Sequence, residues 1–177
     1  MIPILYVWPP WIGKTQKVKQ EFDYVEILLL SSLTEEDIGG IPYHEKGIEK
    51  RTIPPFIQRI QEASKRTDSI CLFLDELDKA RKEVADTCLS LITDKEMFGI
   101  PTHVAIRAAA NPPERWWGDG ISLPMLNRFC VKHVAVDILW SVDFLSKKYP
   151  EIDKKLWDGF LDWSVPMLDI WGEWLNT

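Results

Sequence analysis

No run of apolar residues in this sequence approaches the roughly 20 that a membrane-spanning helix requires. The first residues do not form a basic segment followed by an apolar one, so we expect no signal peptide. Cysteine is scarce, and Cys71, Cys88 and Cys130 lie far apart without the spacing of metal ligands. These absences exclude a membrane-spanning helix and a disulfide framework in this sequence. They favour reduced thiols, a cytoplasmic location and no membrane partner.

Positive charge is in deficit as well. The 21 lysines and arginines face 27 aspartates and glutamates, which leaves a formal net charge of −6. This balance argues against a nucleic-acid groove built from bulk positive charge, while local basic patches stay open. A length of 177 residues suits one domain with a small appendage.

The most informative stretch runs from Ile70 to Leu74 and is followed directly by Asp75 and Glu76. An unbroken apolar run of this length predicts a strand that is buried on both faces. Ligands of open α/β sheets bind at the carboxyl ends of such strands. At that position Asp75 could hold a hydrated Mg²⁺, and Glu76 could orient and deprotonate a water.

A second polar motif follows the first predicted strand, residues 4–7. Gly13, Lys14 and Thr15 stand between this strand and a predicted helix from Thr15 to about Phe22. Strand, loop and helix with Gly-Lys-Thr at the junction is the layout of a P-loop, in which backbone N–H groups and the helix end bind phosphates. Lys14 would reach the terminal phosphates, and the Thr15 hydroxyl would ligate Mg²⁺. The predicted nucleotide-binding residues are Pro10, Trp11, Ile12, Gly13, Lys14 and Thr15.

The loop before Lys14 departs from the full P-loop pattern. Trp8 stands where the pattern has a glycine, and Trp11 where many such loops have another. Glycine allows the backbone to bend tightly and to approach the ligand without a Cβ in the way. An indole at either place could block the pocket or force a wider loop. Taken alone, Gly-Lys-Thr is equally compatible with an exposed turn that opens a helix.

The remaining pattern predicts an α/β fold with a mainly parallel five-stranded sheet and helices on both faces. The further strands are expected at residues 25–30, 104–110 and 131–136, and the further helices at 55–65, 79–93 and 123–129. Residues 31–50 are polar and rich in turn residues, which predicts a looped insertion outside the core. Residues 137–177 are predicted to form a helical, tryptophan-rich appendage, whose indoles are expected to pack and not to stack on bases.

Four features follow one another along the chain: the Gly-Lys-Thr loop, a strand ending on Asp75-Glu76, a strand ending on Asn111 and a short helix ending on Asn127-Arg128-Phe129. In this order they resemble the AAA+ ATPases, and their details resemble the MoxR-like branch, including phage and archaeal-virus relatives. Beside the Gly-Lys-Thr loop, the matching segments are Asp37-Ile38-Gly39-Gly40-Ile41-Pro42, Leu72-Phe73-Leu74-Asp75-Glu76-Leu77, Ala108-Ala109-Ala110-Asn111-Pro112-Pro113-Glu114 and Leu123-Pro124-Met125-Leu126-Asn127-Arg128-Phe129. The resemblance implies a P-loop NTPase core at residues 1–136, with a degenerate P-loop, and a short helical lid at residues 137–177. The lid region carries no arginine after Arg128, so the lid arginine of the family has no candidate.

The resemblance also implies a role for each matching residue. Asp75 would hold Mg²⁺ through water, and Glu76 would polarise the attacking water. Asn111 would hydrogen-bond the γ-phosphate or that water, although a simple turn residue is the alternative. Arg128 would act in trans as an arginine finger in the next subunit's site, with a surface salt bridge as the alternative.

At the level of function, the resemblance implies an ATPase that uses ATP and Mg²⁺ as a motor or remodelling chaperone. Its expected partners are further copies of itself in a ring, with a hexamer as the expected size. A protein client is preferred over nucleic acid, and the expected location is the cytoplasm, or the host cytoplasm if the protein is viral. Tyr43 and His44 in the insertion are candidates for client contact. The alternative is a non-hydrolysing AAA+ scaffold whose P-loop is blocked by Trp8 and Trp11.

Overall fold

The computed structural model describes residues 2–7, 14–113 and 120–134, with positions 146–147, 149–152, 156 and 159 beyond them. The chain divides into two compact units, residues 1–8 with 14–134 and residues 9–13 with 135–177. The elements below all belong to the first unit. The predicted division into a core at 1–136 and a lid at 137–177 stays a prediction, because most of the lid lies outside the described residues.

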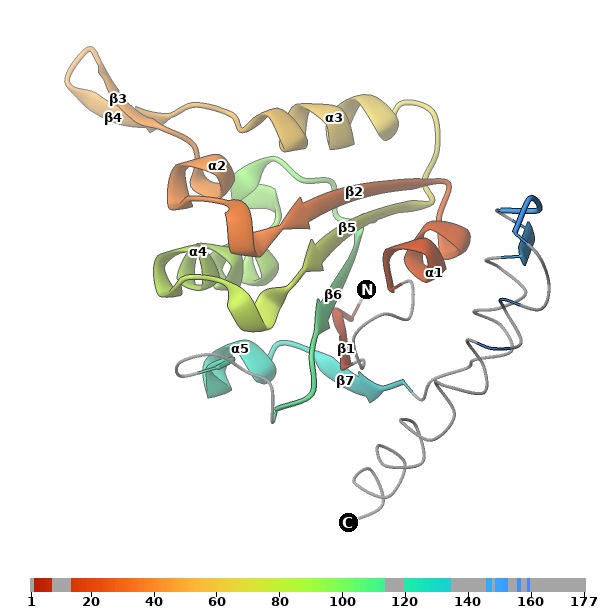
Figure 1. The fold of residues 1–177 in the computed structure, drawn as a ribbon. Helices are drawn as coiled ribbons and strands as arrows, with labels where there is room; N and C mark the ends of the chain where they lie inside the picture. The colour runs from red at the N-terminus through yellow and green to blue at the C-terminus, as the bar shows by residue number, and fades with distance from the viewer. Residues whose placement is uncertain are drawn as a thin grey trace. The chain divides into compact units, whose positions relative to one another are not determined.

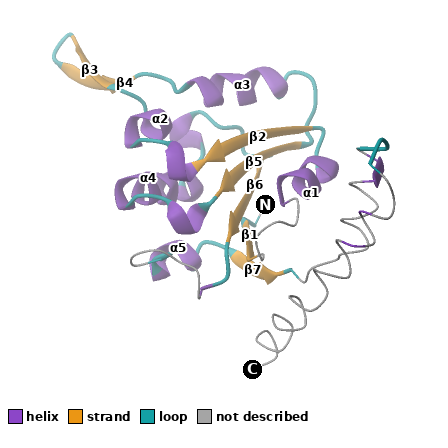
Figure 2. Ribbon diagram, viewed as in Figure 1, coloured by secondary structure: helices purple, strands orange, loops and turns teal. Residues whose placement is uncertain are grey.

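A five-stranded parallel sheet forms the centre of the first unit (Figure 1; Figure 2). Its strands are β1 (Ile4–Val7), β2 (Tyr24–Leu29), β5 (Ile70–Asp75), β6 (Ala105–Ala110) and β7 (Cys130–His133), in the order β2-β5-β6-β1-β7. Every neighbouring pair is parallel. The predicted fold class is therefore confirmed, with the last strand beginning one residue earlier than expected.

The strand order creates a switch point between β1 and β6. From β1 the chain runs to β2 at one edge of the sheet, and from β6 it runs to β7 at the opposite edge. The connections that follow β1 and β6 therefore lead in opposite directions. The register aligns the carboxyl ends, with Val7 opposite Ala110 and Leu29 opposite Asp75. Because ligands of open parallel sheets bind where connections leave in opposite directions, this edge is the expected site.

Helices cover both faces of the sheet, as Figure 1 shows. Helix α1 (Lys14–Glu21) packs on one face, while α3 (Pro55–Ala63) and α4 (Lys82–Thr93) pack on the other. Strand β5 lies between the two layers: Leu72 and Leu74 belong to the α3/α4 core, and Cys71 and Phe73 to the α1 core. All four side chains are fully buried. The unbroken apolar run before Asp75 thus reflects burial on both faces, as predicted.

The prediction of a looped insertion outside the core at residues 31–50 is wrong for the helical part of the segment, whereas its hairpin does lie outside the core. The segment contains helix α2 (Glu35–Gly39) and a hairpin of β3 (Pro42–Glu45) and β4 (Ile48–Arg51), and Ile38 is fully buried in the core. A capping box starts α2, since the Thr34 backbone N–H donates to Asp37 Oδ2 at 2.8 Å. Gly40 ends the helix at φ 78°, where a Cβ would lie 2.0 Å from the Thr52 carbonyl oxygen. The glycines that suggested a loop instead end a helix.

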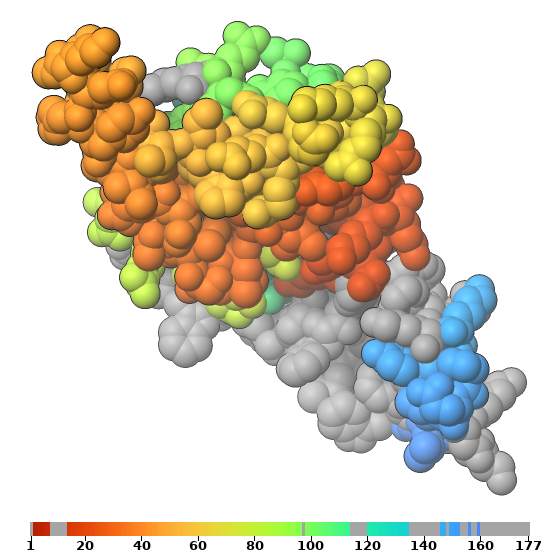
Figure 3. Space-filling view, turned by 90° about the horizontal axis from the view of Figure 1, so that it is seen from above, coloured from red at the N-terminus to blue at the C-terminus, as the bar shows by residue number. Residues whose placement is uncertain are grey.

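The β3–β4 hairpin projects from the body of the unit (Figure 1; Figure 3). Its turn residues, Lys46 and Gly47, have φ values of 52° and 78°, as in the two-residue turns that suit twisted hairpins. Every residue of both strands is exposed, including Tyr43 and Ile48. The remaining elements are α5 (Leu123–Leu126) and three short 3₁₀ turns, η1 (Leu30–Ser32), η2 (Leu77–Lys79) and η3 (Glu96–Phe98). In the part of the chain that is described, no helix combines the length and apolarity needed to cross a membrane.

Candidate active site

Two hydrogen bonds join polar side chains at the carboxyl edge of the sheet. The Thr15 hydroxyl, at the start of α1, donates to Asp75 Oδ2 at the end of β5 over 3.2 Å. Lys14 Nζ donates to Asn111 Oδ1, just beyond β6, also over 3.2 Å. These pairs are 60 and 97 positions apart in the sequence. The fold therefore brings together four of the predicted site residues, from three separate elements.

Burial sets the electrostatics of this cluster. Burial raises the pKa of the Asp75 carboxyl above its ordinary value. Hydrogen bonds from the Glu76 backbone and the Thr15 hydroxyl lower this pKa but offset only part of the effect of burial. Burial also lowers the pKa of the Lys14 ammonium, and the negative charges of Asp75 and Asp78 offset only part of this lowering. Both shifts disfavour the charged form. An anionic phosphate beside Lys14 would oppose the lowering of its pKa, and a cation beside Asp75 would oppose the raising of its pKa. The cluster therefore suits a ligand that brings both charges.

The residues that were predicted to hold Mg²⁺ supply oxygen donors only, which is the chemistry that this ion prefers. The candidates are the Thr15 hydroxyl and the Asp75 carboxylate, which are already in hydrogen-bonding contact. Among the described residues, no group of three or more acidic, histidine or cysteine side chains could hold a metal by itself. The donor set therefore fits Mg²⁺ that arrives with phosphate oxygens and water as its other ligands.

Glu76 has a backbone conformation that is rare for a residue with a side chain. Its φ of 57° and ψ of 43° turn the chain sharply from β5 into η2. Two groups hold its carboxylate: Lys79 Nζ lies 2.7 Å from Oε1, and the Ser31 hydroxyl donates to Oε2 at 2.5 Å. The hydrogen bond from Lys79, followed by that from Ser31, lowers the pKa of Glu76. Glu76 is therefore held as a carboxylate at the edge of the site.

Sequence reasoning missed Ser31 and Lys79, and it also missed Asp78. Asp78 is only 3% exposed. It accepts the Asn111 backbone N–H at 3.1 Å and the Asn111 Nδ2 at 2.8 Å. The available signals were weak: a third acid close after Asp75, and a serine that follows the second strand at the same edge of the sheet.

Arg128 lies just beyond α5, on the surface of the unit. The short helix is anchored by the buried Met125 side chain, and the Arg128 backbone N–H donates to the Met125 carbonyl oxygen at 3.0 Å. Its side chain is exposed and forms no ion pair within the described part of the chain. Neither the trans role of Arg128 nor the alternative of a surface salt bridge is decided by the described residues, and both stay predictions.

Several predicted residues lie outside the described part of the chain. They are Trp8, Pro10, Trp11, Ile12 and Gly13. Their assignment to the phosphate loop stays a prediction, as does the effect of the two indoles.

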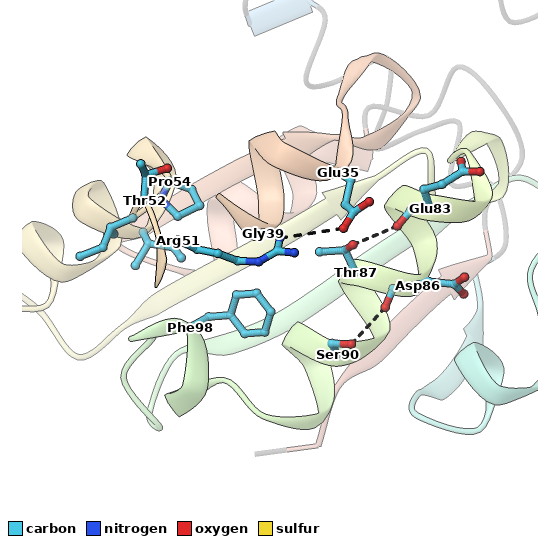
Figure 4. Close-up of a pocket in the computed structure, with 12 residues that line it drawn as sticks. Glu35, Gly39, Arg51, Thr52, Pro54, Glu83, Asp86, Thr87, Ser90 and Phe98 are labelled. Carbon is cyan, nitrogen blue, oxygen red and sulfur yellow. Dashed lines mark hydrogen bonds and ion pairs between the residues drawn. The ribbon is translucent and has the colours of Figure 1, made fainter. Parts of the chain in front are cut away.

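A pocket of about 730 Å³ lies elsewhere, between α2, α4 and the start of α3 (Figure 4). Its rim carries the acids Glu35, Glu83 and Asp86 and a single base, Arg51, which pairs with Glu35 at 3.9 Å. An excess of carboxylates disfavours an anionic phosphate. None of the residues at the carboxyl edge of the sheet lines this pocket, so we do not assign the nucleotide to it.

Replacing Asp75 with asparagine is expected to stabilise the protein at neutral pH. Because the folded-state pKa of Asp75 is raised, its favourable contribution to stability exists at low pH and is lost as the pH rises through that pKa. The amide avoids this loss and can still bond to Glu76 N and Thr15. We expect a gain on the order of 1 kcal/mol, or about 3 °C in Tm, by thermal unfolding.

The pH dependence supplies the control for this prediction. Wild type and Asp75→Asn should converge in stability as the pH falls through the raised pKa of Asp75, because the wild-type carboxyl is then neutral as well. A variant that is less stable than wild type at neutral pH would contradict the assigned cause.

Comparisons with known proteins place the fold. No protein-family model matches the sequence, and no curated protein matches it either. Among solved structures, similarity is found to Thermotoga maritima RuvB, described as a Holliday junction branch migration motor. The alignment has 15% identity and a TM-score of 0.50, and it covers 84% of this chain and 44% of RuvB.

A candidate ATPase from Cytophaga hutchinsonii is similar to the same degree. It aligns with 18% identity and a TM-score of 0.51, over 85% of this chain and 47% of its own length. This chain thus spans less than half the length of each of these two proteins. At such low identity the likeness concerns the fold alone. The chain therefore has an α/β fold, a five-stranded parallel sheet between layers of helices, that is similar to the fold of RuvB.

Proposed function

We propose that this chain is an AAA+ subunit of the MoxR-like type that binds and hydrolyses ATP. One observation carries the proposal: Lys14, Thr15, Asp75 and Asn111 meet at the carboxyl edge of a parallel sheet, at the switch point between β1 and β6. A lysine, a hydroxyl, a carboxylate and an amide in this arrangement supply the groups that triphosphate binding requires. The fold shared with a candidate ATPase and with RuvB supports the same reading.

In this proposal each residue acts on one part of the substrate. Lys14 would bind the terminal phosphates, whose negative charge would oppose the lowering of its pKa by burial. Thr15 and Asp75 would hold Mg²⁺, and the ion would supply positive charge to neutralise the phosphate oxygens. Because Asp75 must be ionised for this role, nucleotide binding should weaken as the pH falls through its raised pKa.

Glu76 accepts a proton from the attacking water. As the water oxygen bonds to the γ-phosphorus, the bond from phosphorus to the β–γ bridging oxygen breaks, and ADP leaves with the electron pair. The proton that Glu76 takes up is then released to solvent or to the inorganic phosphate. Glu76 suits this role because Lys79 and Ser31 keep its carboxylate ionised and fixed in place.

Arg128 would complete the site of a neighbouring copy. Its exposed guanidinium could stabilise the charge that grows on the γ-phosphate in the transition state. This role requires that copies of the chain assemble head to tail, and a closed ring, such as a hexamer, satisfies that requirement.

The client is proposed to be a protein in the cytoplasm, or in the host cytoplasm for a viral protein. The β3–β4 hairpin offers exposed apolar side chains, with Tyr43 at 42% and Ile48 at 62% exposure. The overall charge of −6 disfavours nucleic acid. RuvB is described as a Holliday junction motor, so a nucleic-acid client remains the second candidate for this chain.

The competing proposal is a scaffold that has kept the fold without hydrolysis. It is favoured by Trp8 and Trp11, which stand where a phosphate loop has or often has glycine. The two proposals differ in a single measurable quantity, the affinity for Mg-ATP.

Binding of Mg-ATP by calorimetry tests the proposal. We expect binding below millimolar concentration, and a loss of about 10- to 100-fold in Lys14→Ala, which corresponds to a charge-assisted hydrogen bond of roughly 1.5–3 kcal/mol. Lys19→Ala, an exposed lysine of the same helix, should bind like wild type. No binding by wild type would exclude the enzyme, and recovery of binding in Trp8→Gly with Trp11→Gly would then identify the indoles as the cause.

A further inference from the structure

The proposed ATPase mechanism assigns no role to the buried acid Asp78. It lies in η2, immediately after the catalytic segment of β5, and is only 3% exposed. Burying a carboxylate is costly unless its oxygens are hydrogen-bonded. Both carboxylate oxygens of Asp78 accept hydrogen bonds from a single residue, Asn111. Oδ1 accepts from the Asn111 backbone N–H at 3.1 Å, and Oδ2 accepts from Asn111 Nδ2 at 2.8 Å.

This pairing decides which way the Asn111 amide points. An ionised carboxylate can only accept hydrogen bonds, so the atom that faces it must be the amide nitrogen. The oxygen Oδ1 then faces the other way, where it accepts from Lys14 Nζ at 3.2 Å. If the amide were reversed, its oxygen would meet the Asp78 carboxylate and its nitrogen would meet the Lys14 ammonium, and both contacts would be repulsive.

We propose that Asp78 is a positioning residue, which fixes Asn111 with its amide oxygen toward the phosphate position. This inference rests on the proposed ATPase function for its role in turnover, but the orientation itself does not depend on nucleotide. A carbonyl oxygen cannot accept from a phosphate oxygen, since both are acceptors. The oxygen of Asn111 therefore acts on a donor, which is the Lys14 ammonium or the O–H of the attacking water.

The first experiment needs no nucleotide. The side-chain amide of Asn111 is identified in NMR spectra as the pair of signals lost in Asn111→Ala. We expect its hydrogens to exchange with water at least about tenfold more slowly than those of the exposed Asn127, and Asp78→Asn to remove this protection. Asp86→Asn, an exposed acid on α4, should leave the protection unchanged. An Asn111 amide that exchanges as fast as Asn127 in wild type would overturn the proposal.

The second experiment uses turnover. Asp78→Asn should lower kcat about tenfold or more with KM nearly unchanged, and it should have almost no further effect in an Asn111→Ala background. An equal loss in both backgrounds would show that Asp78 does not act through Asn111. If wild type hydrolyses no ATP, the proposed function fails, and the exchange experiment alone decides the orientation.

A swapped pair separates positioning from folding. Asp78→Asn combined with Asn111→Asp restores the donor and acceptor pairing and should therefore recover the thermal stability that either single variant loses. Turnover should stay low, because a carboxylate then faces Lys14 and the phosphate position. Recovery of kcat together with stability would mean that Asp78 has only a structural role.

Discussion

Replacing Glu76 with glutamine is expected to lower ATP turnover by about 10²- to 10⁴-fold, the usual contribution of a general base. Affinity for Mg-ATP should stay within a few fold of wild type, because Lys14, Thr15 and Asp75 are unchanged. Glutamine retains the shape of the side chain, and its amide can still accept from Lys79 and bond to Ser31. The expected result is thus a protein that holds ATP without hydrolysing it, detected by phosphate release and by calorimetry.

The control for this variant is Glu36→Gln, an exposed acid in the first turn of α2. It changes the net charge equally but lies away from the site residues, so its turnover should match that of wild type. A Glu76→Gln variant that hydrolyses ATP at the wild-type rate would remove Glu76 from the mechanism, while leaving the phosphate site itself in place.

Replacing Arg128 with alanine is expected to reduce turnover by roughly 10³-fold or more, the range seen for arginine fingers, with little change in ATP affinity. The decisive measurement mixes this variant with Glu76→Gln. In a random one-to-one mixture, roughly a quarter of the interfaces would pair an intact Glu76 with an intact Arg128 and would regain activity. Each variant alone would be nearly inactive, so recovery on mixing identifies a site shared between subunits.

Arg66→Ala provides the matched control. Arg66 is exposed at the end of α3, at the amino edge of the sheet, and should neither lower turnover nor rescue Glu76→Gln. A mixture of Arg128→Ala and Glu76→Gln that shows only the sum of its parts would argue that each copy hydrolyses ATP independently, and the proposed trans role of Arg128 would be given up.

The sequence by itself determined the layers of this protein and the edge of the sheet at which its candidate site lies. Apolar runs and their breaks are local properties: the run from Ile70 to Leu74 predicted a strand buried on both faces, and the structure has that strand at Ile70–Asp75. Since parallel strands end at the same edge, Lys14, Asp75 and Asn111 were expected to lie near one another. Hydrogen bonds join Lys14 to Asn111 and its neighbour Thr15 to Asp75.

The tertiary structure alone decided which polar groups contact one another at that edge. Ser31 meets Glu76 only because β2 pairs with β5 in one register, and Asp78 meets Asn111 only because η2 turns back beneath the end of β6. The short helix within residues 31–50 was also missed from the sequence. It is held by burial of Ile38 and by the close approach of Thr52 to Gly40, which are both tertiary contacts. Contacts between residues far apart in the chain depend on strand register and close approach of backbone, and no local pattern encodes either.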